Sequence, residues 1–217
     1  SLSTLAVGNI VEVSGFVDAD GNIRATFIEL EDQNLVDFVV KGEGELTILE
    51  LVKYLEKGGD IRSIDGLYYK NNGRIMKNKD RALIANLDEL PFPVRHLFNR
   101  LNYSYPDTLY KPAMPIITSR GCPGSCAYCS SKSIFGRGFR ARSPKNILME
   151  IEYLIKEFGV KEIHIWDDNF ITEKNRVFQI QDAIKKRNIR IKFAFPNGLR
   201  PDYIDEKVLK SLKDMGT

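Results

Sequence analysis

The spacing of hydrophobic residues changes near residue 113 and predicts a parallel α/β region in the second half of the chain. Short continuous apolar runs in this half are typical of strands that are buried on both faces. Each run is followed by a segment whose apolar residues recur three to four positions apart, which favours an amphipathic helix. The predicted strands cover 113–119, 161–166 and 189–195, and the predicted helices begin at Ser143, Thr172 and Asp205, with Ser143 and Thr172 as N-caps. Repeated strand–helix pairs with short loops indicate parallel βα units joined by right-handed crossovers.

Alternation of apolar and polar positions predicts short antiparallel strands in the first half. Residues 10–30 read as a hairpin around Asp-Ala-Asp-Gly, and residues 66–76 as a second hairpin around Asn-Gly. A short apolar run at 35–40 precedes a helix, in which Thr47 and Glu50 match a capping box. The first half is therefore expected to be a small mixed region with its own hairpins.

Composition narrows the classes of protein without naming one. The chain has 217 residues, of which 43% are hydrophobic, so it can bury a sizeable core. A net charge of +3 is too small to indicate nucleic-acid binding. No apolar run reaches the roughly 18 residues that a membrane-spanning helix needs, and the first residues do not resemble a secretory signal. We therefore expect a cytoplasmic protein that acts on a small-molecule substrate.

All three cysteines lie within one short segment, at Cys122, Cys126 and Cys129. Close-set thiols of this kind point to metal binding or catalysis in a reducing compartment and not to disulfides. They follow the predicted strand 113–119 and so belong at the carboxyl edge of the sheet, where ligands gather in α/β proteins. Thiolates suit iron–sulfur clusters and zinc. In a cubane cluster, three thiolates would leave one iron open to a further ligand.

Other interpretations of the cysteines stay open at this point. A structural zinc site could combine the three thiolates with His96 or His164, in a chain that acts as a non-catalytic zinc- or cluster-binding interaction module. The chain has no second cysteine pair of the kind such sites usually carry. Simple electron transfer normally uses a cluster with four cysteine ligands.

The cysteine segment, with Tyr128 just before its last cysteine, resembles the signature of radical S-adenosylmethionine (radical SAM) enzymes. Further segments over residues 35–217 resemble, in order, the subgroup whose radical domain follows a cobalamin-binding domain. The segments are VDFVVKGEGE, GLYYKNNGRI, NLDELPFP, TSRGCPGSCAYCSS, WDDNF and NGLRPD.

The resemblance implies a specific chemistry. The three cysteines would hold a 4Fe–4S cluster, whose fourth iron would chelate the methionine end of SAM and whose electron would cleave SAM to a 5′-deoxyadenosyl radical. Methylation, ring formation and rearrangement are reactions of this subgroup, and a reducing partner such as flavodoxin or ferredoxin would supply the electron. Further cofactor contacts are expected from residues that otherwise suit turns or the surface: Tyr128 near the adenine, Asp167 and Asp168 near the SAM amino group, and Asn197 and Arg200 near the ribose or carboxylate.

The resemblance also implies a domain order. It predicts a partial (β/α) TIM-type barrel of parallel βα units, preceded by a small α+β or β-hairpin region. The absence of an Asp-x-His-x-x-Gly motif argues against cobalamin binding by this chain, and three βα units suggest an N-terminal fragment of the enzyme. The expected parts are a hairpin or barrel-like segment at 1–34, a remnant of a cobalamin-binding-type domain at 35–85, a linker at 86–112 and the N-terminal half of the radical SAM barrel at 113–217.

Overall fold

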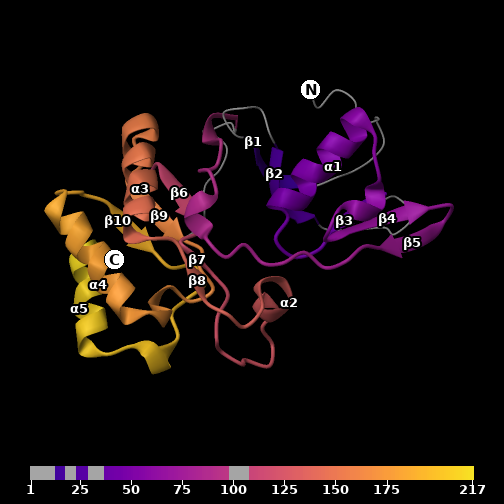
Figure 1. Cartoon of the computed structure of the whole chain (residues 1–217). Coiled ribbons are helices and arrows are strands. Elements are labelled where there is room, and N and C mark those ends of the chain that lie inside the picture. The colour runs from indigo at the N-terminus through magenta and orange to yellow at the C-terminus, as the bar shows by residue number, and fades with distance from the viewer. Residues whose placement is uncertain (1–12, 18–22, 29–36, 98–107) are drawn as a thin grey trace. The chain divides into compact units, whose positions relative to one another are not determined.

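The computed structural model describes residues 13–17, 23–28, 37–97 and 108–217 (Figure 1). The chain divides into two compact units, Ser1–Ile84 with Pro91–Phe98 and Ala85–Leu90 with Asn99–Thr217. Within the described ranges, none of the helices has both the length and the apolar character to cross a membrane. The predicted domain boundaries stay predictions.

The first unit contains both predicted hairpins. Strand β1 (Val13–Val17) pairs antiparallel with β2 (Ile23–Ile28), while the turn at 18–22 lies outside the described residues. The second hairpin lies in a three-stranded antiparallel sheet of order β3-β4-β5, whose strands are Phe38–Val40, Leu67–Asn71 and Arg74–Lys77. Asn72 and Gly73 connect its last two strands with φ angles of 48° and 76°, as the predicted Asn-Gly turn requires.

The helix of the first unit, α1 (Glu45–Lys57), begins earlier than the sequence predicts. Its N-cap is Gly44, which has no capping side chain, so the predicted capping box of Thr47 and Glu50 is wrong. The Thr47 hydroxyl instead donates to the Asp65 carbonyl at 2.8 Å, and Glu50 pairs with Arg81. These tertiary partners occupy the two side chains that would otherwise have capped the helix.

The second unit is built on the three strands that the apolar runs predict. Strands β6 (Ala113–Ile116), β9 (Glu162–Ile165) and β10 (Lys192–Ala194) form a parallel sheet of order β10-β9-β6. Neighbouring strands in the sheet are thus consecutive along the parallel βα series. This confirms the predicted α/β class.

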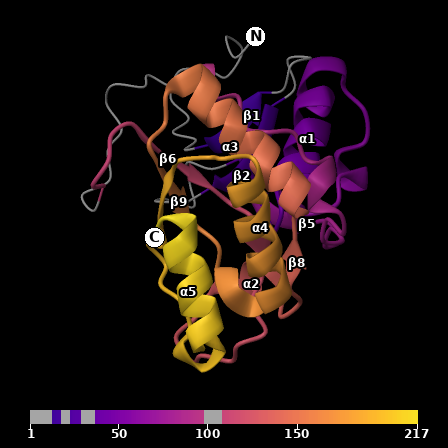
Figure 2. The same cartoon turned by 90° about the vertical axis from the view of Figure 1, so that its left-hand side faces the viewer.

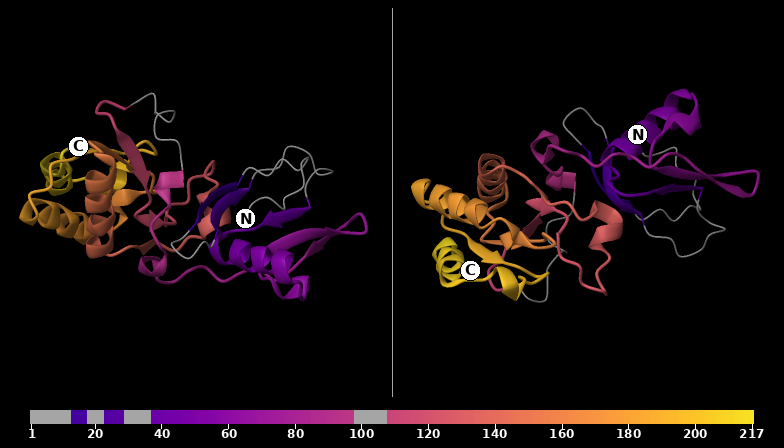
Figure 3. Two further views of the ribbon diagram at one scale, coloured as in Figure 1. Left: turned by 90° about the horizontal axis from the view of Figure 1, so that it is seen from above. Right: turned by 60° about the horizontal axis from the view of Figure 1, so that its bottom comes forward.

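Three helices follow these strands and lie side by side (Figure 2), gathered on one side of the sheet in further views (Figure 3). They are α3 (Pro144–Phe158), α4 (Lys174–Lys186) and α5 (Glu206–Met215). Ser143 caps α3 as predicted, and Asp205, where the third helix was predicted to begin, caps α5; they accept backbone N–H bonds at 3.1 and 2.8 Å. The predicted cap at Thr172 is wrong, because its hydroxyl bonds Asn169 and α4 starts after Glu173.

Short 3₁₀ helices join these elements: η2 (Ile61–Ser63), η3 (Leu87–Glu89), η4 (Arg95–Leu97), η5 (Phe170–Thr172) and η6 (Pro201–Tyr203). The predicted linker carries η3 and η4. Asp88 in η3 accepts the Ser143 backbone N–H at 2.8 Å and so fixes the start of α3.

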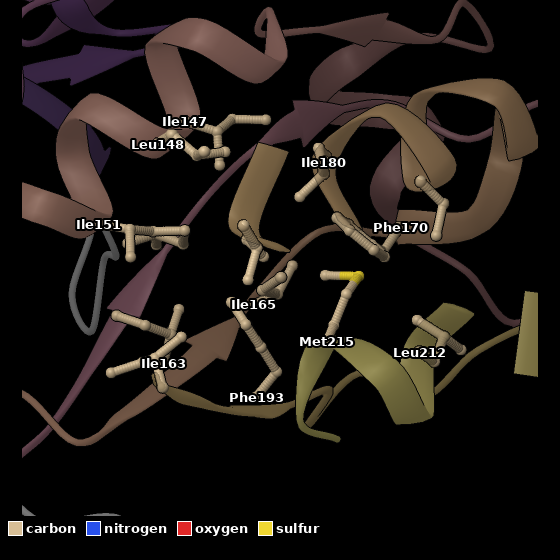
Figure 4. Close-up of a cluster of buried hydrophobic side chains, with 14 of the residues drawn as sticks. Ile147, Leu148, Ile151, Ile163, Ile165, Phe170, Ile180, Phe193, Leu212 and Met215 are labelled. Atoms are coloured by element: carbon tan, nitrogen blue, oxygen red, sulfur yellow. The ribbon is translucent and has the colours of Figure 1, made fainter. Parts of the chain in front are cut away.

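One hydrophobic core holds the second unit together (Figure 4). It joins the sheet to all three helices, and several of its large side chains are entirely or almost entirely buried: Ile147, Leu148, Ile151, Leu154, Ile163, Phe170 and Ile180. Each such side chain contributes about 1.5–3 kcal/mol by leaving water. The core makes the sheet a rigid support for the loops that follow its strands.

Candidate functional site

The functional residues that the sequence predicts lie on three loops at one edge of the sheet. Because β6, β9 and β10 are parallel, their carboxyl ends share an edge, and ligand sites of α/β proteins form there. The loop after β6 carries the cysteines, the loop after β9 carries Asp167 and Asp168, and the loop after β10 carries Asn197 and Arg200.

The cysteine loop contains elements that the sequence analysis missed. A two-residue strand β7 (Ser119–Arg120) pairs antiparallel with β8 (Arg140–Ala141), and the short helix α2 (Ser131–Phe135) lies between them in the chain. Gly121, at φ 81°, follows β7, and a Cβ there would lie 2.0 Å from the Gly138 carbonyl oxygen. Only glycine allows the two ends of the loop to approach this closely.

The three cysteines are free thiols, with Cys122 half-buried and Cys126 and Cys129 exposed. The Gly124 N–H donates to Cys122 Sγ at 3.4 Å, and the Cys129 N–H donates to the Cys126 carbonyl at 3.2 Å. Among the described residues, no three His, Cys, Asp or Glu side chains converge as a formed metal site. The chemistry of the donors nevertheless fits a thiolate-bound cluster, because three unpaired thiols share one short loop.

Asp167 is buried, with 2% of its surface exposed, and lies under the start of this loop. Its carboxylate accepts the Thr118 N–H at 2.6 Å, the Thr118 hydroxyl at 2.5 Å and the Ser119 hydroxyl at 2.5 Å. Three hydrogen bonds to one carboxylate are a strong tie between two strand ends. Asp167 therefore anchors the chain where it leaves β6 toward the cysteines.

Arg176 completes this buried network and was missed by the sequence analysis. Its guanidinium donates to the Thr118 carbonyl at 2.9 Å and lies 3.8 Å from Asp167 Oδ2. Burial lowers the pKa of Arg176, and the nearby Asp167 carboxylate opposes that shift. The sequence could have identified Arg176 as an inward-facing residue, because it precedes the inward-facing Ile180 by four residues and so lies on the same face of α4.

The neighbouring loop residues reinforce the same junction. Asp168 accepts the Gly121 N–H at 3.0 Å, one residue before the first cysteine. Asn197 donates to the Trp166 and Asp167 carbonyls at 3.2 and 3.3 Å, which ties the loop after β10 to the loop after β9. The structure thus brings the predicted Asp167, Asp168 and Asn197 together through protein contacts, and their expected contacts with SAM stay predictions.

Arg200 reaches the cysteine loop directly. Its Nη1 donates to Cys126 Sγ at 3.0 Å, and its Nε and Nη2 form a two-pronged pair with Asp202 at 3.0 and 2.6 Å. The hydrogen bonds with Asp202 raise the pKa of Arg200, and the same pair lowers the pKa of Asp202. A fixed positive charge therefore lies against one of the three thiols.

Two further expectations concern Tyr128 and His164. Tyr128 is 93% exposed on the cysteine loop, and its predicted contact with adenine stays a prediction. His164 is fully buried in β9, with its Nε2 2.6 Å from Glu162 Oε1. This pairing agrees with a packing role for His164 and does not favour it as the fourth ligand of a zinc site.

The fold and the loop define the class of the second unit: a parallel α/β domain that presents clustered thiols after its first strand. A profile of the Radical SAM superfamily matches residues 116–217. The chain belongs to this superfamily, as the cysteine motif predicts. A second profile, described as a domain of unknown function, matches residues 1–29.

Curated relatives support the enzyme class. A Pyrococcus horikoshii protein described as an uncharacterized methyltransferase is 39% identical over 181 residues, which are 83% of this chain and 38% of that protein. The anaerobic magnesium-protoporphyrin IX monomethyl ester cyclase of a Synechocystis strain is 33% identical over 156 residues, which are 72% of this chain and 30% of the cyclase. The chain thus spans well under half the length of these relatives, whose descriptions name a methyltransferase and a cyclase.

A solved structure agrees with the fold. The radical S-adenosylmethionine methyltransferase TsrM from Kitasatospora setae, with cobalamin and a 4Fe-4S cluster bound, matches with a TM-score of 0.61 at 18% identity, over 83% of this chain and 36% of TsrM. At this identity the likeness concerns the fold alone.

Proposed function

We propose that this chain binds a 4Fe–4S cluster through Cys122, Cys126 and Cys129 and uses it in the reductive cleavage of SAM. The observation that carries the proposal is the set of three free thiols in one loop at the carboxyl end of β6, within the superfamily match. When bound, such a cluster supplies one electron to SAM and yields a 5′-deoxyadenosyl radical.

The residues of the chain contribute position and charge to this chemistry. Asp167 and Asp168 hold the loop by its first residues, through Thr118, Ser119 and the Gly121 N–H. Because these contacts are buried or half-buried, they limit the conformations that the loop can adopt before a ligand arrives. Tyr128, exposed on the same loop, is available to pack against the adenine ring of SAM.

We further propose that the parallel sheet is part of a (β/α) barrel. Three consecutive strands lie in chain order and are followed by helices on one side, as in such barrels. The expected outcome for the substrate is methyl transfer, cyclisation or a related change at a small molecule, with a flavodoxin- or ferredoxin-type protein as reductant. We do not assign cobalamin binding to this chain, because it lacks the ligand motif and His164 is buried against Glu162.

Anaerobic reconstitution tests the proposal. The full chain should bind about four irons, as a single cubane cluster requires, and produce 5′-deoxyadenosine from SAM and a strong reductant. Cys122→Ser, Cys126→Ser and Cys129→Ser should each lose the cluster, whereas Ser133→Ala, on the exposed side of α2, should keep it. A colourless protein with one zinc per chain would overturn the proposal in favour of a structural metal site.

A further inference from the structure

The contact between Arg200 and Cys126 joins residues that lie 74 positions apart in the chain. Arg200 stands on the loop after β10, and Cys126 is the middle cysteine of the loop after β6. The donor is Arg200 Nη1, and the acceptor is Cys126 Sγ at 3.0 Å. Asp167 and Asp168 bind the start of the loop, whereas Arg200 donates a hydrogen bond to a predicted metal ligand itself.

Several neighbours fix the guanidinium in this position. Asp202 binds its Nε and Nη2, which leaves Nη1 directed at the sulfur. The Arg200 backbone N–H donates to the side chain of Asn169, which is fully buried, at 3.3 Å. A planar guanidinium held at two of its nitrogen atoms keeps little rotational freedom for the third.

Gly124 makes room for this approach from the side of the cysteine loop. A Cβ at Gly124 would lie 2.5 Å from Arg200 Nη1 and 3.3 Å from Cys122 Sγ. Any side chain there would displace the end of Arg200 while leaving its charge in the protein. The contact between Arg200 and Cys126 thus depends on the absence of a side chain at Gly124.

We propose that Arg200 keeps this hydrogen bond to the Cys126 sulfur in the cluster-bound protein and raises the reduction potential of the cluster. The inference rests on the proposed function. Reduction adds one electron to the cluster, and part of the added negative charge is carried by the cysteine sulfurs. A positively charged donor at one sulfur stabilises the reduced state more than the oxidised state.

The same geometry argues against the expected role of Arg200 as a ligand of the SAM carboxylate. A carboxylate is best bound by two parallel N–H groups of a guanidinium. In this structure Asp202 already binds the paired N–H groups of Nε and Nη2, and Cys126 accepts an N–H of Nη1. Arg200 is therefore assigned to the sulfur as a positioning and tuning residue.

The test measures the midpoint potential of the reconstituted full chain by EPR-monitored titration, without SAM. Arg200→Gln should lower the equilibrium constant for reduction by about tenfold, which corresponds to about 59 mV for a one-electron couple. Gly124→Ala should also lower this equilibrium constant, although it retains the charge of Arg200. Arg187→Gln is the matched control, because it removes one positive charge from a side chain that pairs with Glu152 and not with a cysteine.

The outcomes separate this inference from the proposed function. Equal potentials for wild type, Arg200→Gln and Gly124→Ala, at equal iron content, would overturn the inference alone. A weaker affinity for SAM in Arg200→Gln with an unchanged potential would also overturn it and return Arg200 to the carboxylate. A wild-type chain that never takes up a cluster would overturn the proposed function and this inference together. If Arg200→Gln binds no iron, the midpoint potentials of Gly124→Ala and Asp202→Asn test the inference instead.

Discussion

Asp167 offers the sharpest test of how the second unit holds the cysteine loop. Asp167→Ala would remove the acceptor of three hydrogen bonds from Thr118 and Ser119, both of which are themselves buried. It would also leave the charge of Arg176 without the carboxylate that lies 3.8 Å away.

The expected cost follows from these contacts. A buried N–H left without an acceptor costs about 1–3 kcal/mol, and removing one partner of a buried ion pair costs about 3–5 kcal/mol. The two hydroxyls can rotate toward other acceptors, so the Thr118 N–H and Arg176 dominate and the contributions overlap. We expect Asp167→Ala to reduce the free energy of unfolding by about 3–5 kcal/mol, and Asp167→Asn by roughly half of that.

Chemical denaturation followed by tryptophan fluorescence measures this loss. The chain contains a single tryptophan, Trp166, which directly precedes Asp167 and so reports on the unfolding of this unit. Asp182→Ala, at an exposed position of α4, is the matched control and should change stability by less than about 0.5 kcal/mol. A loss of stability below about 1 kcal/mol for Asp167→Ala would refute the reasoning. Arg176→Met should also destabilise the Asp167→Ala variant less than it destabilises the wild type, and equal losses in the two backgrounds would refute the coupling.

Three further predictions concern other parts of the second unit. Gly121→Ala should sharply lower iron uptake, because its Cβ would meet the Gly138 carbonyl at 2.0 Å; normal iron content on reconstitution would contradict this. Ser143→Ala should destabilise the unit by about 1 kcal/mol through loss of the α3 cap, measured by denaturation, and a neutral result would show that the cap is dispensable. The hydrogen bond with Lys174 lowers the pKa of Asp205, so its stabilisation is present above about pH 4 and is lost as the pH falls through the lowered pKa. Asp205→Asn should keep the cap and flatten that acid dependence, and an unchanged stability–pH profile would count against it.

The fold of the second unit was largely predictable because its signals are local and repeated. Apolar runs predicted all three parallel strands, and two helix starts, at Ser143 and Asp205, were predicted correctly. The two helix starts that were predicted wrongly share one cause. Thr47 and Thr172 have hydroxyls that bond other residues, Asp65 and Asn169, and a sequence pattern does not show such partners.

The place of the candidate site in the fold was predictable from the sequence, and the contacts of its side chains were less so. The three cysteines that the spacing predicts as ligands, Cys122, Cys126 and Cys129, lie within the superfamily match at residues 116–217. Asp167 and Arg200 lie at the expected edge of the sheet, but their observed partners are protein groups that lie distant in sequence, and their contacts with SAM stay predictions. Arg176 was missed because a charged residue in a helix is usually solvated, and only its place on the inward face distinguishes it.

The parallel βα order, the three-thiol loop and the superfamily could be predicted from the sequence, because they depend on hydrophobic period and on residue spacing along a short stretch. The tertiary structure alone decided what each polar side chain at the edge of the sheet contacts. Asp167 faces Thr118 and Arg200 faces Cys126 because parallel strands bring their carboxyl ends to one edge. Segments that the chain separates by about fifty residues or more thereby come within hydrogen-bonding distance, and the pairing of individual atoms there is set by packing and not by pattern.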